Sequence, residues 1–175
     1  MIWILDDLET HGPIMTRVIK DICASTSEIY NTNPSDIFNL YDILKKFYDV
    51  VDKDDLVLIP WAVKADIYLD TLVYNIADKA QIFCSAGNDN SSVLNYSPTR
   101  LPNVRVVGCL NKSLKPTQVT NYGRDDMYWV VGTSYDIDQA THSGSSISAA
   151  VCVALAHKHK DLNQAIYDYN LSCKL

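Results

Sequence analysis

Two kinds of hydrophobic pattern alternate along the chain, and each predicts one kind of element. Short continuous apolar runs are typical of strands buried on both faces, and apolar residues spaced three or four apart are typical of amphipathic helices. We expect strands at 2–5, 26–30, 56–59, 81–85, 104–107 and 128–131. We expect helices at 11–22, 36–48, 66–79, 146–158 and 162–169. Thr10 and Ser35 are the expected N-caps of the first two helices, and 88–102 is an expected polar loop.

The alternation of strands and helices predicts how the chain is organised in space. Strand–helix–strand units connect in a right-handed sense and place parallel strands between two layers of helices. The expected fold is therefore α/β, a three-layer α/β/α sandwich with a mainly parallel sheet. Neither an internal repeat nor a low-complexity tract divides the chain, so we expect a single domain over residues 1–175.

Composition narrows the partners and cofactors that fit this chain. The formal net charge of −6 argues against a nucleic-acid surface, which needs a basic patch. The five cysteines are scattered and lack zinc-site spacing, so we expect no metal, no cofactor and a reducing, cytoplasmic setting. No apolar run has the length of a membrane span, and neither a secretory leader nor a propeptide is recognisable, so we expect no membrane partner. The oligomeric state is left open.

Four polar residues lie at the boundaries of the expected elements. Asp6 and Asn88 follow strands, whereas His11 and Ser146 open helices. The carboxyl ends of parallel strands meet at one edge of a sheet, and ligands bind at that edge. We therefore expect these four side chains to lie at the same edge.

These residue types match the requirements of acyl transfer, which needs a nucleophile, a base, a group that orients the base and donors for the oxyanion. Ser146 is the expected nucleophile, His11 the base and Asp6 the residue that orients the imidazole, with Asp7 as a competing choice. Asn88 would donate its side-chain amide to the oxyanion, together with the backbone N–H of Ser146. Taken singly, Ser146 is typical of an N-cap and Asn88 of a turn, so the argument depends on their joint order.

Four short segments in this order resemble the signature blocks of the subtilisin-like (subtilase) serine proteases. They are Asp6, His11-Gly12, Ala86-Gly87-Asn88 and Gly144-Ser145-Ser146. The stretch 96–108 and the turn 121–123 are also similar to family segments. The resemblance implies the family's α/β/α fold and a serine endopeptidase that cleaves protein or peptide substrates through an acyl-enzyme. It further implies substrate contacts at Pro60, Trp61, Ala62, Ser85, Ala86 and Gly87, with Trp61 lining the cleft.

The chain also departs from the family pattern. Pro13-Ile14 replace a Thr-His pair, Ala150 replaces a proline after the serine block, and only four residues separate Asp6 from His11. Pro60 lacks the backbone N–H that an edge pairing with substrate would use. These departures keep open a second interpretation, a catalytically silent subtilase fold that acts as a binding or structural component.

Two other classes are less favoured by the residues. The related sedolisin class uses Glu and Asp in place of His, and it normally carries Asp where this chain has Asn88. A nucleotide-binding α/β domain would need glycines after the first strand, where the chain instead has the acidic run 6–9. His142 is expected in a loop outside the triad, and Cys84 in the core.

Overall fold

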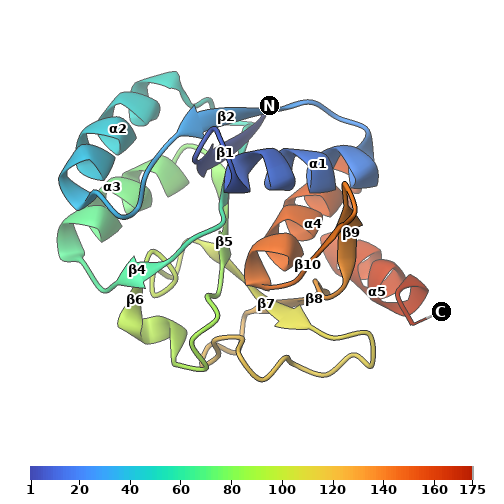
Figure 1. The fold of residues 1–175 in the computed structure, drawn as a ribbon. Helices are drawn as coiled ribbons and strands as arrows, with labels where there is room; N and C mark the ends of the chain where they lie inside the picture. The colour runs from blue at the N-terminus through green and yellow to red at the C-terminus, as the bar shows by residue number, and fades with distance from the viewer. Residues whose placement is uncertain (175) are drawn as a thin grey trace.

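A six-stranded parallel sheet forms the middle layer of the fold (Figure 1). The computed structural model describes residues 1–174, so residue 175 of the expected domain lies outside the described residues. The strands lie in the order β2-β1-β3-β5-β7-β8. Their bounds are β1 (Ile2–Asp6), β2 (Ser27–Asn31), β3 (Leu56–Ile59), β5 (Gln81–Ser85), β7 (Arg105–Leu110) and β8 (Tyr128–Val131). Each predicted strand is therefore confirmed, with shifts of a few residues at the ends.

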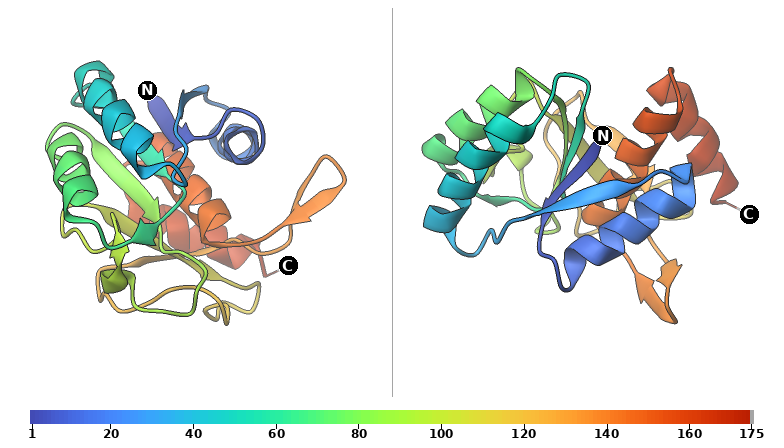
Figure 2. Two further views of the ribbon diagram at one scale, coloured as in Figure 1. Left: turned by 60° about the vertical axis from the view of Figure 1, so that its left-hand side comes forward. Right: turned by 90° about the horizontal axis from the view of Figure 1, so that it is seen from above.

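Helices cover both faces of this sheet (Figures 1 and 2). One layer contains α1 (His11–Cys23), α4 (Ser145–Lys158) and α5 (Leu162–Ser172), and the other contains α2 (Ile37–Val50) and α3 (Ile67–Ala77). The predicted three-layer α/β/α sandwich is confirmed. The last helix continues three residues past its predicted end at Tyr169.

Successive residues of each central strand contribute to opposite layers of the core. Ile4 and Leu58 pack with α1 and α4, whereas Leu5 and Ile59 pack with α2 and α3. Parallel strands that are buried on both faces are expected to be apolar without interruption. This two-sided burial explains the continuous apolar runs in the sequence.

Helix α4 is the most deeply buried helix of its layer. All residues from Ile147 to Leu155 are at most 5% exposed, and the helix packs on the sheet between α1 and α5. Burial of one Val, Leu or Ile side chain contributes about 1.5–3 kcal/mol, so the helix is held firmly along its length. The first turn of α4, which carries Ser146, is consequently fixed at the carboxyl edge of the sheet.

The predicted cap of α2 is wrong, whereas Thr10 is the N-cap residue of α1 as predicted but does not cap through its side chain. The cap of α2 is Asp36 rather than Ser35, because the Asp36 carboxylate accepts the N–H of Asn39 at 3.2 Å. At α1, the side chain of Thr10 makes no capping bond, and the carboxylate of Asp7 takes that role. In both places a nearby aspartate supplies a charged acceptor to the positive end of the helix, where a carboxylate is stabilised.

Several short elements were missed by the sequence patterns. The segment 88–102 was expected to be a polar loop, but it contains a 3-10 turn, Val93–Asn95, and β6 (Tyr96–Ser97), which pairs with β4 (Val63–Lys64). β9 (Tyr135–Ile137) and β10 (Ala140–His142) form a hairpin that projects from the body of the molecule (Figure 2). His142 therefore lies in a strand and not in a loop. Strands of two or three residues are too short to produce a periodic signal.

Residues 1–174 contain no helix that combines the length and apolar character required to cross a lipid bilayer.

Candidate active site

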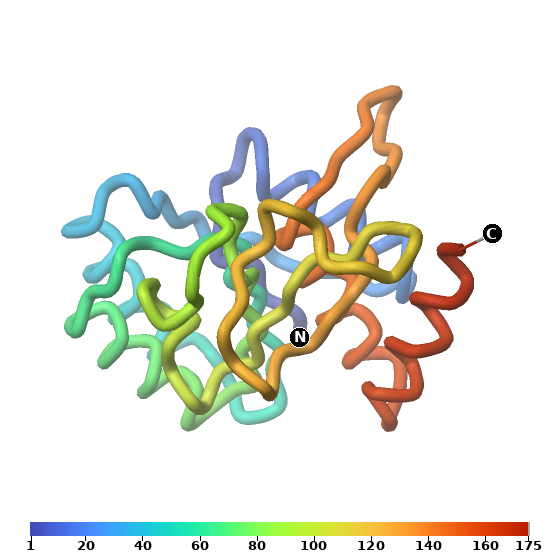
Figure 3. Tube along the Cα trace, turned by 90° about the horizontal axis from the view of Figure 1, so that it is seen from below, coloured from blue at the N-terminus to red at the C-terminus, as the bar shows by residue number. Residues whose placement is uncertain are grey.

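The candidate residues come from loops and helix starts that gather at one edge of the sheet. β1 ends at Asp6, α1 begins at His11, Asn88 lies in the turn after β5, and α4 begins at Ser145. Figure 3 shows the loop after β1, the loop after β5 and the start of α4 on the same side of the molecule. The strand order also reverses at β1, which has β2 on one side and β3 on the other. Such a switch point is where α/β sheets bind ligands.

Asp6 and His11 are joined by a short hydrogen bond at this edge. Oδ2 of Asp6 lies 2.5 Å from Nδ1 of His11, the Asp6 side chain is 6% exposed and the imidazole is 39% exposed. The hydrogen bond to Asp6 raises the pKa of His11 above 6.5, burial opposes that rise, and the charges of Asp6 and Asp7 reinforce it. Bonding through Nδ1 leaves Nε2 available to another group.

Asp7 binds the start of α1 and not the imidazole. Its Oδ1 accepts the backbone N–H groups of Glu9 at 2.9 Å and Thr10 at 2.5 Å, and its Oδ2 accepts that of His11 at 3.0 Å. Burial acts to raise the pKa of Asp7, but the hydrogen bonds from Thr10, His11 and Glu9 outweigh it and lower the pKa to about 2. The two adjacent aspartates thus have separate partners, which the sequence alone left undecided.

Three serines lie in the first turn of α4, and only one of them has an available hydroxyl. Ser145 is fully buried and its Oγ accepts the N–H of Gly87 at 3.1 Å. Ser148 is fully buried and its Oγ donates to the carbonyl of Val130 at 2.9 Å. Ser146 is partly exposed, and no hydrogen bond joins its hydroxyl to another residue within 1–174. The geometry therefore singles out Ser146 among its neighbours as the accessible hydroxyl.

Asn88 is connected directly to the start of α4. Its Oδ1 accepts the backbone N–H of Ser145 at 3.1 Å, so its Nδ2 is the end of the amide left to donate elsewhere. Gly144 has a φ of +142°, and a Cβ at that position would lie 3.4 Å from Nδ2 of Asn88. The backbone N–H of Ser146 belongs to a first helical turn and has no partner inside the helix. Two donors, Nδ2 of Asn88 and the N–H of Ser146, are therefore available near the start of α4.

The segment expected to bind substrate after β3 is partly a core segment. Trp61 is 9% exposed, and its indole N–H donates to the carbonyl of Leu5 at 2.7 Å. Its side chain therefore supports the end of β1, and only a small part of the ring is left for contact with a substrate. Pro60 is buried, whereas Ala62 is partly exposed.

The second segment expected to bind substrate is also occupied by internal contacts. Ser85 and Ala86 are buried at 2% and 0% exposure. The N–H of Ala86 donates to Val107, and the N–H of Gly87 donates to Ser145. The N–H groups of Ala86 and Gly87 are therefore not free to donate to a substrate.

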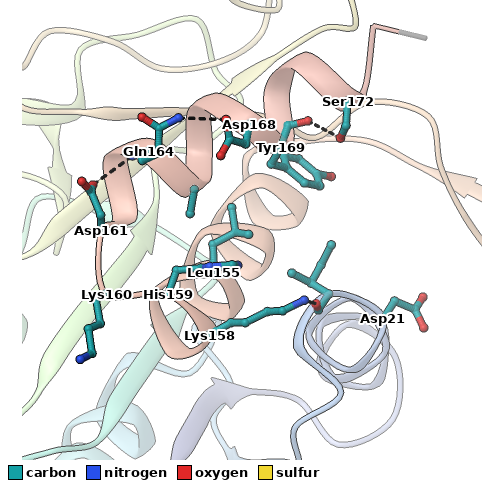
Figure 4. A pocket seen from close by; sticks show the side chains of 12 residues that line it. Asp21, Leu155, Lys158, His159, Lys160, Asp161, Gln164, Asp168, Tyr169 and Ser172 are labelled. Atoms are coloured by element: carbon teal, nitrogen blue, oxygen red, sulfur yellow. Dashed lines mark hydrogen bonds between the residues drawn. The ribbon is translucent and has the colours of Figure 1, made fainter.

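A cavity of about 450 Å³ lies away from these residues, between the C-terminal ends of α1 and α4 and the length of α5 (Figure 4). Several of its polar side chains are paired locally. Asp161 accepts the N–H of Gln164 at 3.0 Å, and Gln164 donates to Asp168 at 2.9 Å. The cavity is separate from the candidate active site, because His11 and Ser146 lie at the opposite, N-terminal ends of α1 and α4.

Within the described chain, residues 1–174, no group of three or more His, Cys, Asp or Glu side chains is arranged to hold a metal ion.

Comparisons with known proteins identify the fold. No family model matches the chain, and no curated protein matches it significantly. A cold-adapted subtilisin-like serine proteinase superposes with a TM-score of 0.68 at 17% identity, over 85% of this chain and 57% of its own. The prenylagaramide maturation protease PagA superposes with a TM-score of 0.67 at 14% identity, over 89% of this chain and 73% of its own. A protease from Pseudoalteromonas arctica gives a TM-score of 0.52 at 15% identity, over 59% and 38% of the two chains. The fold is subtilisin-like.

Proposed function

We propose that this chain is a serine endopeptidase in which Ser146, His11 and Asp6 act as a triad and Asn88 donates to the oxyanion. The observation that supports it most is the pairing of Asp6 with Nδ1 of His11, which leaves Nε2 as the proton acceptor. The accessible hydroxyl of Ser146 on the first turn of the adjacent helix α4 supplies the nucleophile. Peptides and proteins are the proposed substrates, in keeping with the subtilisin-like proteases that share the fold.

The reaction proceeds in two balanced halves. Oγ of Ser146 forms a bond to the substrate carbonyl carbon while Nε2 of His11 takes the hydroxyl proton, and the carbonyl electron pair moves to oxygen. The oxyanion accepts hydrogen bonds from Nδ2 of Asn88 and the N–H of Ser146. As the C–N bond breaks, His11 gives its proton to the departing amine. Water then attacks the acyl carbon while Nε2 of His11 takes its proton. The oxyanion pair returns to carbon as the C–Oγ bond breaks, and His11 gives the proton to Oγ, which releases the acid and restores Ser146.

Asp6 contributes by holding the imidazole in one tautomer. Its carboxylate accepts a hydrogen bond from the Nδ1–H group, so Nε2 carries the lone pair that receives the Ser146 proton. It also stabilises the imidazolium that forms during the reaction, in line with the raised pKa of His11. Hydrogen bonds between nucleophile and base commonly tighten in the substrate complex, so the free hydroxyl of Ser146 is compatible with this role.

A second candidate is a catalytically silent fold that binds a partner. It is favoured by Pro60, which lacks an N–H, and by the engaged N–H groups of Ala86 and Gly87. Hydrolysis of an unstructured protein such as denatured casein separates the two. The proposed enzyme cleaves it, Ser146→Ala does not, and the control Ser143→Ala retains the rate. A folded wild-type protein without Ser146-dependent hydrolysis favours the silent fold.

The proposal also includes a cellular compartment and a domain organisation. All five cysteines are free thiols, and Cys84, Cys109 and Cys152 are buried. This usage supports a reducing compartment such as the cytoplasm. One continuous sheet with helices on both faces supports a single domain.

A further inference from the structure

A buried asparagine outside the proposed triad holds the turn that carries Asn88. Asn121 is 0% exposed and follows β7 in a segment that runs beside residues 86–91. Its Oδ1 accepts the N–H groups of Asp89 at 2.9 Å and Ser91 at 3.0 Å. Its Nδ2 donates to the carbonyl of Ala86 at 3.0 Å. The side chain thus binds the backbone on both sides of Asn88.

The backbone of the same segment adds further contacts to the turn. The N–H of Asn121 donates to the carbonyl of Gly87 at 3.0 Å, and the N–H of Asn90 donates to Val119 at 2.8 Å. Gly87 has a φ of +95°, and a Cβ there would lie 2.5 Å from Nδ2 of Asn121. The absence of a side chain at Gly87 therefore permits the close approach of Asn121.

The side chain of Asn88 makes few contacts of its own. It is exposed, and its side chain is attached through one hydrogen bond, from the N–H of Ser145 to Oδ1. The Gly-Asn-Asp-Asn run is typical of turns with several accessible conformations. The direction of the Asn88 amide therefore depends on the backbone that Asn121 fixes.

We propose that Asn121 is a positioning residue that aims the Asn88 amide at the oxyanion. This inference rests on the proposed function, in which Nδ2 of Asn88 is an oxyanion donor. Such a donor acts only at about 2.7–3.1 Å from the oxygen on which charge develops. A displacement of the turn by about 1 Å can cost roughly 100-fold in rate, so a residue that never touches substrate controls the chemical step.

A double-mutant cycle tests the proposal. Asn88→Ala is expected to lower kcat by about 100- to 1,000-fold. Asn121→Ala is expected to lower kcat by at least about tenfold, with KM nearly unchanged, because it misplaces a donor that acts in the transition state. The double variant is expected to be no slower than Asn88→Ala alone, since Asn121 acts through Asn88.

Thr120→Val is the matched control. Thr120 is 3% exposed, lies next to Asn121, and its Oγ1 accepts the N–H of Cys109 at 3.0 Å, away from the turn. This variant loses a buried hydrogen bond and is expected to keep the wild-type kcat. Equal kcat values for Asn121→Ala and Thr120→Val, or losses from Asn88→Ala and Asn121→Ala that multiply, overturn the proposal.

Two further measurements keep the result separate from folding and from the proposed function. If Asn121→Ala does not fold, Asn121→Asp replaces it. The aspartate keeps the acceptor for Asp89 and Ser91, and it puts a second acceptor in place of the donor to Ala86. The same non-additivity is expected. The NMR resonances of the Asn88 side-chain amide are followed in each folded variant. They are expected to shift in the Asn121 variants and not in Thr120→Val, and unchanged resonances overturn the positioning role even if the wild type hydrolyses nothing. Absence of wild-type hydrolysis alone contradicts only the proposed function.

Discussion

Oδ2 of Asp6 lies 2.5 Å from Nδ1 of His11, although the neighbouring carboxylate of Asp7 is bonded to the backbone N–H of the same histidine. Asp6 ends a buried strand and Asp7 begins the exposed loop that follows. The pair can therefore divide two tasks, one for the imidazole and one for the helix start. This division leads to distinct expectations for variants of the two residues.

The activity should depend on pH through His11. A general base must be neutral, so kcat/KM is expected to rise with pH as His11 loses its proton, with a midpoint above 6.5 because Asp6 raises the pKa. Asp6→Asn removes the charge that raises the pKa, so the midpoint is expected to fall toward 6.5, and kcat to drop by about 10⁴-fold. Peptide hydrolysis between pH 5 and 10 measures both effects. A midpoint that Asp6→Asn leaves unmoved contradicts the pairing.

The raised pKa of His11 also makes the free energy of unfolding depend on pH. Since the folded-state pKa of His11 lies above its ordinary 6.5, the stabilisation from its pairing with Asp6 is complete below pH 6.5 and is lost as pH rises through the raised pKa. The difference in free energy of unfolding between wild type and His11→Gln is therefore expected to shrink from pH 6 to pH 9. Urea denaturation at several pH values measures this difference. A difference that grows with pH would indicate a lowered pKa instead.

Asp7→Ala should affect stability more than chemistry. Loss of a helix cap costs about 1 kcal/mol, and Asp7 accepts bonds from three backbone N–H groups. This contribution is complete above pH 3.8 and is lost as pH falls through about 2. Urea denaturation at pH 7 is expected to show the loss, while kcat falls far less than in Asp6→Asn. Equal losses of kcat in the two variants contradict the separation of roles.

Trp61→Phe tests whether this indole is a core side chain. The variant keeps most of the apolar ring but leaves the carbonyl of Leu5 without its donor, so the free energy of unfolding is expected to fall by about 1–3 kcal/mol. KM for peptide substrates is expected to change little, because the ring is 9% exposed. A large change of KM with unchanged stability would indicate that Trp61 contacts the substrate.

Gly144→Ala should disturb both the start of α4 and the oxyanion donor. The φ of +142° is unfavourable for alanine, at a cost of about 1–3 kcal/mol, so the backbone that contacts the amide of Asn88 must shift to relieve it. We expect a lower thermal midpoint and a kcat at least about tenfold lower. Circular dichroism and peptide hydrolysis measure the two effects. Wild-type kcat in this variant contradicts the role given to the Asn88 amide.

The layered fold was predictable because its central strands are buried on both faces and therefore consist of continuous apolar runs. Runs such as Leu56–Ile59 need no tertiary information to be recognised. The hairpin of β9 and β10 was not predictable, because each strand has only three residues and mixes apolar with polar side chains without a clear period. Its turn places Asp138 and Gln139 at positive φ, which the residue types only weakly indicate.

The candidate site was predictable in its residue types and chain order, but not in the contacts that separate close alternatives. Asp6 and Asp7 are adjacent and chemically identical, so only their distances to His11 tell them apart. Burial likewise separates Ser146 from Ser145, and it assigns most of the Trp61 ring to the core. Burial of this kind depends on packing between segments far apart in the chain.

The central claim is that Asp6 and His11 activate the hydroxyl of Ser146. The most direct measurement is peptide mapping by mass spectrometry after reaction with a fluorophosphonate probe. The account predicts a single adduct, on Ser146, that forms at pH 8 in the wild type and is lost or strongly slowed in His11→Ala. A folded wild-type protein that gains no adduct, or gains one with equal speed in His11→Ala, contradicts it.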